Sequence, residues 1–243
     1  MKKNCKEKIS VIALGGSIVF PHKFTDGGLN VPFLTDFRKF ILEQTSQGKR
    51  FVLVVGGGKA ARLYQHVAKK IADPGQEALD WLGIRATRLN AQLILDILKE
   101  VAHPFIIHYE PSANEAKILS NCEHKVVVAA GWGPGWSTDY VAVRCSEIFG
   151  QNETIIDGDT AFVYDKDPNK FSDANPITDI TWKEYNKLIP EVWTPGMSAP
   201  VDPVAARYAQ KHKIRIKTAQ GTDLENFLNV IDGKPFEGTV IHD

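Results

Sequence analysis

Short segments made almost wholly of apolar residues, many of them β-branched, recur along the chain, and glycines follow several of them directly. The segments 9–14 and 51–55 both end in this way, at Gly15 and Gly56. A strand that is apolar on both faces must be covered on both faces, which is typical of a parallel sheet between layers of helices. The stretches between these segments carry apolar residues at spacings of three and four, as amphipathic helices do. The pattern therefore predicts an α/β protein with a mainly parallel central sheet.

The same pattern predicts where the elements lie. Strands are expected at 9–14, 51–55, 105–107, 125–130, 154–156, 214–217 and 238–241. Helices are expected at 31–47, 59–71, 76–101, 139–149 and 203–212. Two further helices are predicted to begin at Thr181 and Thr222, each with a glutamate three positions on, as in a capping box.

The balance of charge narrows the classes of partner. The chain has 29 Lys and Arg residues against 29 Asp and Glu residues, a formal net charge of zero. This is unlike a strongly basic nucleic-acid-binding protein or a polybasic membrane-surface protein, so neither nucleic acid nor a membrane is expected as a partner. No apolar run approaches the roughly 20 residues that span a bilayer. Cys5, Cys122 and Cys145 are expected to be free thiols, and with no signal-peptide pattern we expect a cytoplasmic protein.

Three glycine-rich turns after predicted strands are the candidate binding features. They lie at 15–17, 56–59 and 131–139. Glycine lets backbone amides come close to a ligand, and the N-terminus of a following helix favours a phosphate group. One such turn is readily explained by steric needs alone, but three turns on one sheet favour a site for an anionic ligand. Neither a P-loop nor a G-x-G-x-x-G turn after a strand is present.

Charged and polar residues near these turns each allow two interpretations. Arg62 is one helical turn beyond Gly58, where its guanidinium can reach an anion at the helix start or pair with a surface carboxylate. Asp80 is either a helix cap or a ligand contact. Any residue of the segment 137–139 could be the N-cap of the helix that it opens. The residues alone leave these alternatives open.

No other catalytic or metal-binding pattern is found in the sequence. The histidines have no metal-ligand spacing. The acidic stretch 165–169 begins like a calcium loop but lacks its glycine and its glutamate at the twelfth position. No nucleophile elbow occurs. A metal site made by the protein alone is therefore not predicted.

Taken in order, seven motifs resemble the amino acid kinase family, and within it the branch of archaeal-type uridylate kinases. They lie at 14–17, 54–62, 80–91, 134–139, 163–168, 201–206 and 237–241. The resemblance implies a three-layer αβα sandwich, with a mainly parallel central sheet, in a single domain over residues 1–243. The part at about 1–150 would bind the phosphoryl acceptor and the part at about 151–243 would bind ATP. A homo-oligomer, typically a hexamer, is also implied.

The resemblance further implies roles for individual residues. The catalytic residues would be Arg62, Asp139 and Asp202, the last two near the Mg²⁺ that accompanies ATP. The ATP contacts would be Gly15, Gly16, Ser17, Gly58, Tyr164 and Asp167. The acceptor contacts would be Gly57, Asp80, Trp132, Gly133, Pro134, Gly135, Trp136, Ser137 and Thr138. The implied activity is transfer of the ATP γ-phosphoryl group to UMP to give UDP.

Two departures from the family pattern leave alternatives open. Many members have a lysine where this chain has Ala13, and the segment 158–164 reads G-D-T-A-F-V-Y where T-N-V-D-G-V-Y is usual. The first alternative is a kinase of the same family that acts on another small phosphate or carboxylate. The second is a non-catalytic member that binds a nucleotide or another anion.

Overall fold

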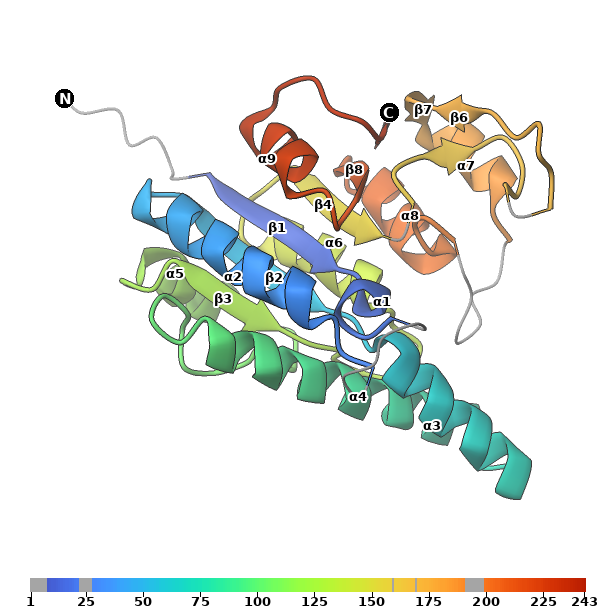
Figure 1. Ribbon diagram of the computed structural model, residues 1–243, viewed down its shortest axis with the longest axis horizontal. Coiled ribbons are helices and arrows are strands. Elements are labelled where there is room, and N and C mark those ends of the chain that lie inside the picture. Colours follow the sequence, from blue (N-terminus) through green and yellow to red (C-terminus); the bar gives the residue numbers. More distant parts are fainter. Residues whose placement is uncertain (1–7, 22–27, 159, 169, 191–198) are drawn as a thin grey trace.

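A seven-stranded sheet in the order β3-β2-β1-β4-β8-β9-β7 forms the centre of the computed structural model, which describes residues 8–21, 28–158, 160–168, 170–190 and 199–243 (Figure 1). Its strands are β1 (Ile9–Leu14), β2 (Arg50–Val55), β3 (Val126–Ala129), β4 (Glu153–Gly158), β7 (Asp179–Thr181), β8 (Arg215–Gln220) and β9 (Thr239–His242). All neighbouring pairs are parallel except β8 and β9. A separate antiparallel pair is made by β5 (Val163–Tyr164) and β6 (Pro176–Ile177).

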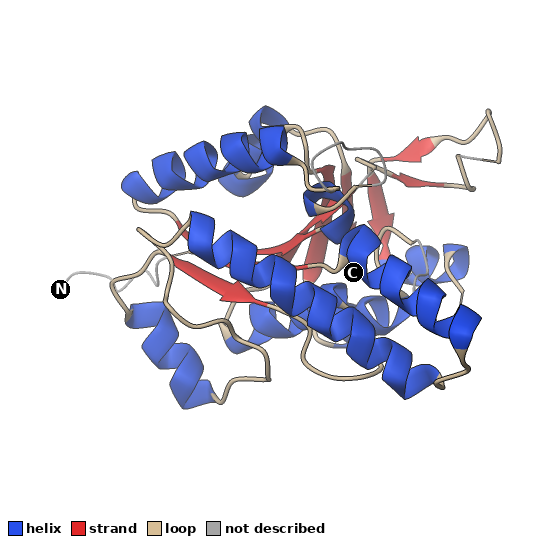
Figure 2. Ribbon diagram, turned by 60° about the horizontal axis from the view of Figure 1, so that its bottom comes forward, coloured by secondary structure: helices blue, strands red, loops and turns tan. Residues whose placement is uncertain are grey.

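Helices cover both faces of the sheet, because successive side chains of a strand point to opposite faces. Along β1, Val11 and Ala13 belong to one apolar core, and Ile12 and Leu14 belong to the other. The first core is closed by α6 (Thr138–Ile148), α7 (Trp182–Leu188) and α8 (Pro203–Lys211). The second core is closed by α2 (Val31–Ser46), α4 (Gln76–Ile97) and α9 (Leu224–Asp232). Figure 2 shows helices on both sides of the strands, and the expected αβα sandwich is confirmed.

The remaining helices are α1 (Gly16–Val19), α3 (Gly58–Ile71) and α5 (Ala113–Asn121). Of these, α3 runs beside α4 and projects beyond the sheet (Figure 1). The side-chain amide of Gln65 on α3 donates a hydrogen bond of 2.9 Å to the carbonyl of Leu79 on α4. None of the residues of α3 is fully buried. Among the described elements, α4 is therefore the main support of this helix.

Two predicted element positions are wrong. The segment 105–107 forms no strand, because it touches β3 only through the single pair of Ile107 with Ala129, and Phe105 is 72% exposed. A strand needs consecutive pairs along its neighbour, and the chain here only crosses the edge of the sheet. The helix predicted at 76–101 ends at Ile97.

The structure corrects the predicted cap of one helix and contains one capped helix that the sequence analysis does not predict. The helix α9 is capped by Asp223, whose carboxylate accepts the N–H of Asn226 at 3.0 Å, and not by Thr222. The helix α5 was not predicted, although Ser112 and Glu115 form a complete capping box at its start. The capping box predicted at Thr181 is confirmed.

The described cysteines, Cys122 and Cys145, are free. Burial raises the pKa of the Cys145 thiol, so it stays protonated in the core. Cys5 lies outside the described residues. None of the described helices has the length and apolar character needed to cross a bilayer.

Candidate active site

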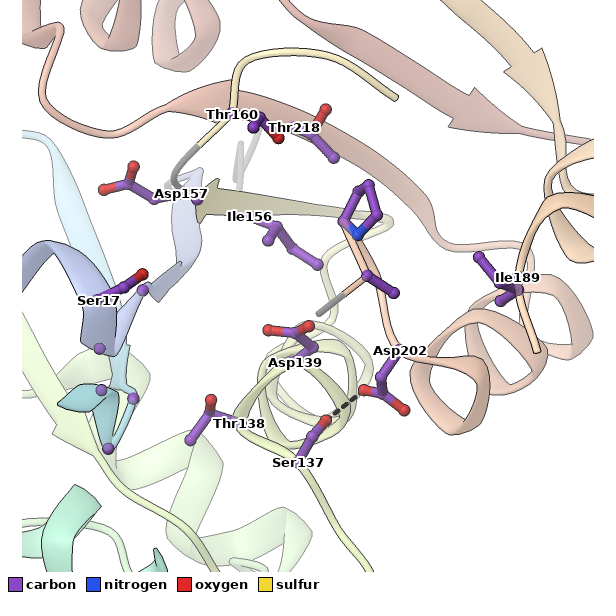
Figure 3. A pocket seen from close by; sticks show the side chains of 18 of the residues that line it. Ser17, Ser137, Thr138, Asp139, Ile156, Asp157, Thr160, Ile189, Asp202 and Thr218 are labelled. Carbon is purple, nitrogen blue, oxygen red and sulfur yellow. Dashed lines mark hydrogen bonds between the residues drawn. The ribbon is translucent and has the colours of Figure 1, made fainter. Parts of the chain in front are cut away.

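A cleft of about 720 Å³ opens beyond the carboxyl ends of β1, β2 and β4. Open α/β sheets bind ligands at this edge because the loops and helix N-termini converge there. Most of the residues predicted as site residues contribute to its wall. They are Gly15, Gly16, Ser17, Gly57, Gly58, Arg62, Asp80, Gly133, Trp136, Ser137, Thr138, Asp139, Tyr164, Asp167 and Asp202. Figure 3 shows part of this wall from close by.

Three predicted acceptor contacts are not among the lining residues. Pro134 and Gly135 belong to the loop after β3 but do not line the cleft. Trp132 is 5% exposed and belongs to the apolar core against α6. Its ring meets that of Trp136 edge-on, with 6.5 Å between centroids, so Trp132 supports a wall residue from behind. Its buried indole Nε1 has no hydrogen-bond partner among the described residues.

The turns after β1 and β2 meet backbone against backbone beside the cleft. A Cβ on Gly16 would lie 2.2 Å from the amide nitrogen of Gly58, and a Cβ on Gly58 would lie 2.0 Å from the carbonyl oxygen of Gly16. Gly58 also has a φ of +59°, which glycine adopts without strain. The N–H of Gly15 donates to the carbonyl of Asp157 at 2.9 Å. These glycines are thus sterically required and line the cleft at the same time, so the two interpretations of the turns do not compete.

Arg62 lies one turn into α3 and is the one arginine on the described part of the cleft wall. Its position four residues after Gly58 places both on the same side of the helix. Lys59 does not line the cleft, and its backbone N–H donates to the carbonyl of Phe20 at 3.1 Å. The geometry therefore favours Arg62 over Lys59 as a contact for an anionic ligand.

The start of α6 presents three polar side chains to the cleft. Ser137 is the N-cap, since its hydroxyl oxygen accepts the N–H of Tyr140 at 3.0 Å. The same hydroxyl donates to the carboxylate of Asp202 (Figure 3). Because Ser137 takes the capping role, Thr138 and Asp139 remain available to a ligand, and both line the cleft.

Asp139 and Asp202 form a pair of neighbouring carboxylates that two helices bring together. Asp202 is the N-cap of α8, and its Oδ1 accepts the amides of Val204 at 2.8 Å and Ala205 at 3.1 Å. Desolvation, together with repulsion from Asp202, raises the pKa of Asp139 to about 8. Desolvation also raises the pKa of Asp202, although its hydrogen bonds from Ser137 and from the two amides oppose this. The repulsion between two such carboxylates is relieved when the pair binds a proton or a cation.

The charge of the wall indicates what an anionic ligand would need. Its described acidic residues are Asp80, Asp139, Asp157, Asp165, Asp167 and Asp202, and its described cations are Arg62 and Lys166. A phosphate ligand in this cleft therefore requires added positive charge. Within the described ranges no group of three or more His, Cys, Asp or Glu side chains could hold a metal ion by itself. A pair of carboxylates does fit Mg²⁺, which typically takes one or two of them and completes its shell with phosphate oxygens and water.

Asp80 projects from the second turn of α4 and links that helix to the loop after β3. The N-cap of α4 is Gly75, so Asp80 is not a helix cap. Its Oδ1 accepts the side-chain amide of Gln76 at 3.2 Å, and its Oδ2 accepts the N–H of Gly135 at 2.8 Å. Asp80 lines the cleft but is only 8% exposed. Its carboxylate therefore holds the loop after β3 and also lines the cleft.

The altered segment 158–162 follows β4 and is anchored to the neighbouring strands β8 and β9; residue 159 lies outside the described residues. The hydroxyl of Thr218 on β8 donates to the carbonyl of Ala161 at 3.0 Å, and the N–H of Val163 donates to the hydroxyl of Thr239 at 2.8 Å. Phe162 lies on the cleft wall. This part of the wall is therefore held by contacts between residues far apart in the sequence, and the segment itself contains no motif that predicts them.

Several lining residues were missed by the sequence analysis. They include Gln65, Thr87, Asp157 and Thr218. Asp157 had a signal, because it is an acidic residue at the carboxyl end of a buried strand, paired in register with Leu14. It is 1% exposed, and a Cβ on Gly221 would lie 1.5 Å from its Oδ1. Thr218 had no local signal, since only the strand order brings β8 beside β4.

The fold and the cleft define a class: an α/β protein with a ligand site at the carboxyl ends of its strands, walled by glycine turns and an acidic pair suited to a phosphate-bearing ligand. The family model described as "Amino acid kinase family" matches residues 8–218. The chain belongs to the amino acid kinase family.

Individual relatives and structures agree with this assignment. The uridylate kinase of Methanocaldococcus jannaschii is 32% identical over 232 residues, which are 95% of this chain and 98% of that protein. The uridylate kinase of Thermoplasma volcanium is 33% identical, over 96% and 97% of the two chains. The crystal structure of uridylate kinase from Archaeoglobus fulgidus matches with a TM-score of 0.78 and 28% identity, over 96% and 99% of the two chains. A UMP kinase from Bacillus anthracis, 18% identical with a TM-score of 0.78, shares the fold.

Proposed function

We propose that this chain transfers the γ-phosphoryl group of ATP to UMP, giving UDP and ADP. The observation that carries the proposal is the single cleft in which the glycine turns of β1 and β2 lie between two walls. One wall comes from α4 and the loop after β3, and the other from β4, β5 and the start of α8. Relatives that align with nearly the whole chain are uridylate kinases, which supports UMP as the acceptor.

Within this proposal the two parts of the chain have different ligands. The part at about 1–150 binds UMP through Gly57, Asp80 and the residues of the loop after β3 and the start of α6 that line the cleft, which are Gly133, Trp136, Ser137 and Thr138. The part at about 151–243 binds the adenosine of ATP through Tyr164 and Asp167, while Gly15, Gly16, Ser17 and Gly58 hold its phosphates. The arrangement of the lining residues around the cleft supports this division, because both groups face one space.

The chemistry asks mainly for positioning and for charge neutralisation. An oxygen of the UMP phosphate attacks the γ-phosphorus of ATP, a new P–O bond forms, and the bond from that phosphorus to the β–γ bridging oxygen breaks. No general base is needed, because the attacking oxygen is already anionic. Backbone amides of the glycine turns and the guanidinium of Arg62 stabilise the charge that shifts onto the phosphate oxygens.

The acidic pair would provide the site for the cation that charge neutralisation still requires. Asp139 and Asp202 would hold Mg²⁺ against the donor phosphates, and the ion when bound supplies the positive charge that six aspartates and two cations on the described wall do not. Ala13 is buried on the face covered by α6 and α8 and does not line the cleft. Charge neutralisation thus falls to Arg62, the amides and the ion, which makes the reaction strictly dependent on a divalent cation.

A coupled assay with purified protein tests the proposal directly. ATP and Mg²⁺ are supplied with UMP, CMP, AMP or isopentenyl phosphate in separate reactions. We expect UMP to be the preferred acceptor. Preference for another acceptor would point to a different kinase of the same family. Absence of transfer to any of them would favour a non-catalytic nucleotide- or anion-binding protein.

We also propose that the protein acts in the cytoplasm as a homo-oligomer, with a hexamer as the expected assembly, and contributes to pyrimidine nucleotide synthesis. Exposed apolar side chains on α3 support self-association. The balanced net charge supports small-molecule nucleotides, and not nucleic acid, as ligands.

A further inference from the structure

The helix α4 holds the loop after β3 at three points. Asp80 accepts the N–H of Gly135 at 2.8 Å, and the hydroxyl of Thr87 accepts the N–H of Gly131 at 2.9 Å. At the third point the guanidinium of Arg88 donates to backbone carbonyls of the same loop. The first two residues line the cleft, whereas Arg88 does not. Arg88 therefore acts on the loop and not on a ligand.

Arg88 serves three carbonyl groups at once. Its Nε and a terminal nitrogen each lie 3.4 Å from the carbonyl oxygen of Gly131. The same terminal nitrogen lies 3.5 Å from the carbonyl of Trp132 and 3.2 Å from that of His108. Because Thr87 holds the N–H of Gly131 while Arg88 holds its carbonyl, the backbone of Gly131 is held from both sides.

The surroundings of Arg88 exclude the usual role of a surface arginine, which is to pair with a neighbouring carboxylate. It forms no ion pair with any described carboxylate, so its donors serve backbone carbonyls. Its guanidinium lies 5.9 Å from the ring centroid of Trp81, two helical turns earlier on α4, which fixes the direction of the side chain. A planar fork with several donors suits neighbouring carbonyls, and a lysine cannot reproduce it.

The loop that Arg88 holds leads directly into the acceptor wall. Gly133 and Trp136 line the cleft, and the N–H of Trp136 donates to the carbonyl of Gly133 at 3.3 Å, closing a tight turn. A shift of the peptides at 131–132 would move this turn, since only three residues separate Trp132 from Trp136. A small displacement of the groups that contact a ligand is enough to lower its affinity strongly and to disturb its correct orientation.

We propose that Arg88 is a positioning residue that fixes the loop 131–136 in the conformation that binds the phosphoryl acceptor. The identity of that acceptor as UMP rests on the proposed function, but the role of Arg88 in holding the loop does not. The role is specific to the acceptor side, because the contacts of Arg88 with the described residues are with α4, the loop after β3 and His108.

The variant Arg88→Met removes the donors and keeps an unbranched apolar side chain. We expect the KM for UMP to rise about tenfold, while the KM for ATP changes by less than about twofold. Arg85→Met is the matched control, since Arg85 is on the same helix, is exposed, and makes no hydrogen bond or ion pair in the described part of the chain. It should behave as wild type. Arg88→Lys should be intermediate, with about a threefold rise, and replaces the methionine variant in the test if that variant does not fold.

Hydrogen exchange of the unliganded protein gives a readout that needs no activity. The amide protons of residues 131–133 and 135–137 should exchange about tenfold faster in Arg88→Met than in wild type or Arg85→Met. Unchanged exchange overturns the proposal, as does an equal rise in the KM values for UMP and ATP. If the wild-type protein does not phosphorylate UMP, the proposed function fails, and the exchange rates alone then decide whether Arg88 holds the loop.

Discussion

At the scale of single residues, Arg62 carries the clearest prediction about catalysis. Its planar guanidinium can bridge two phosphate oxygens with two parallel N–H groups, a geometry that the tetrahedral ammonium of lysine does not have. We expect Arg62→Lys to lower kcat at least about tenfold, because part of its stabilisation grows as charge shifts in the transition state. Steady-state kinetics with saturating ATP and UMP measure this. Lys59→Ala, at a residue that does not line the cleft, should cost much less. Equal kinetics of Arg62→Lys and wild type would remove Arg62 from the mechanism.

The acidic pair gives a prediction about stability. The pKa of Asp139 is raised from 3.8 to about 8 in the folded chain, so the folded state binds more protons than the unfolded state between these values. Stability of the metal-free protein therefore falls as the pH rises through this window. Asp139→Asn removes the titrating charge and should raise stability by at least about 1 kcal/mol at pH 8, and by less at pH 5.

Thermal unfolding in the presence of a chelator measures this difference, and the matched kinetic assay should show that the same variant has lost most of its activity. A variant that is less stable than wild type at pH 8 would mean that the carboxylate of Asp139 is stabilising where it stands. Asp139→Ala is the less useful choice, because it also opens a cavity and loses the hydrogen bond from the Asp202 backbone.

At the scale of elements, the junction of the turns after β1 and β2 is the most constrained part of the fold. Gly58→Ala would place a Cβ at a φ of +59° and 2.0 Å from the carbonyl oxygen of Gly16. Gly48→Ala is the matched control, because Gly48 has a φ of +91° but nothing within 4 Å of its Cβ position. Strain alone should cost Gly48→Ala about 1 kcal/mol. Gly58→Ala should cost at least about 2 kcal/mol more and should lower kcat, since the turns must move apart.

Urea unfolding of the two variants provides the comparison, with the slope of the transition as a check that both unfold as wild type does. Similar losses of stability would show that the junction yields easily and that its close approach does not depend on glycine.

At the scale of the whole molecule, an apolar stripe on α3 predicts self-association. It consists of Leu63, Tyr64, Val67 and Ile71, which are 51%, 63%, 43% and 81% exposed. Their spacing places them along one side of a helix that no other described element covers. The double variant Val67→Glu with Ile71→Glu should therefore lower the mass of the assembly. Phe105→Glu is the control, because Phe105 is 72% exposed on a different edge of the molecule.

Light scattering coupled to size-exclusion chromatography gives the mass as a multiple of the 27.0 kDa chain. A wild-type protein that elutes at the mass of one chain would contradict the prediction, as would an unchanged mass of the double variant.

The sequence by itself determined the local features of this protein. An apolar strand followed by glycines, such as the segment 9–14 with Gly15, is encoded in a few neighbouring residues, because burial on both faces and a tight turn are local requirements. The same holds for the capping box at Thr181, and the sequence encodes the one at Ser112 and Glu115 in the same local way. The order of the motifs along the chain was enough to indicate the family and, through it, the sandwich.

Only the tertiary structure decided which of these features meet. Asp139 and Asp202 are 63 positions apart, and their carboxylates become neighbours only because α6 and α8 cover the same face of the sheet. The sequence does not distinguish Asp80 from a helix cap; in the structure Gly75 is the N-cap of α4, and the carboxylate of Asp80 accepts the N–H of Gly135. The sequence gives no reason to separate Trp132 from Trp136, yet Trp132 is buried in the core and Trp136 lines the cleft. The physical reason is the same for the acidic pair, for Asp80 and for Trp132. Burial, pKa and hydrogen-bond partners depend on distances in space. The strand order sets those distances, and no short segment of the sequence determines the strand order.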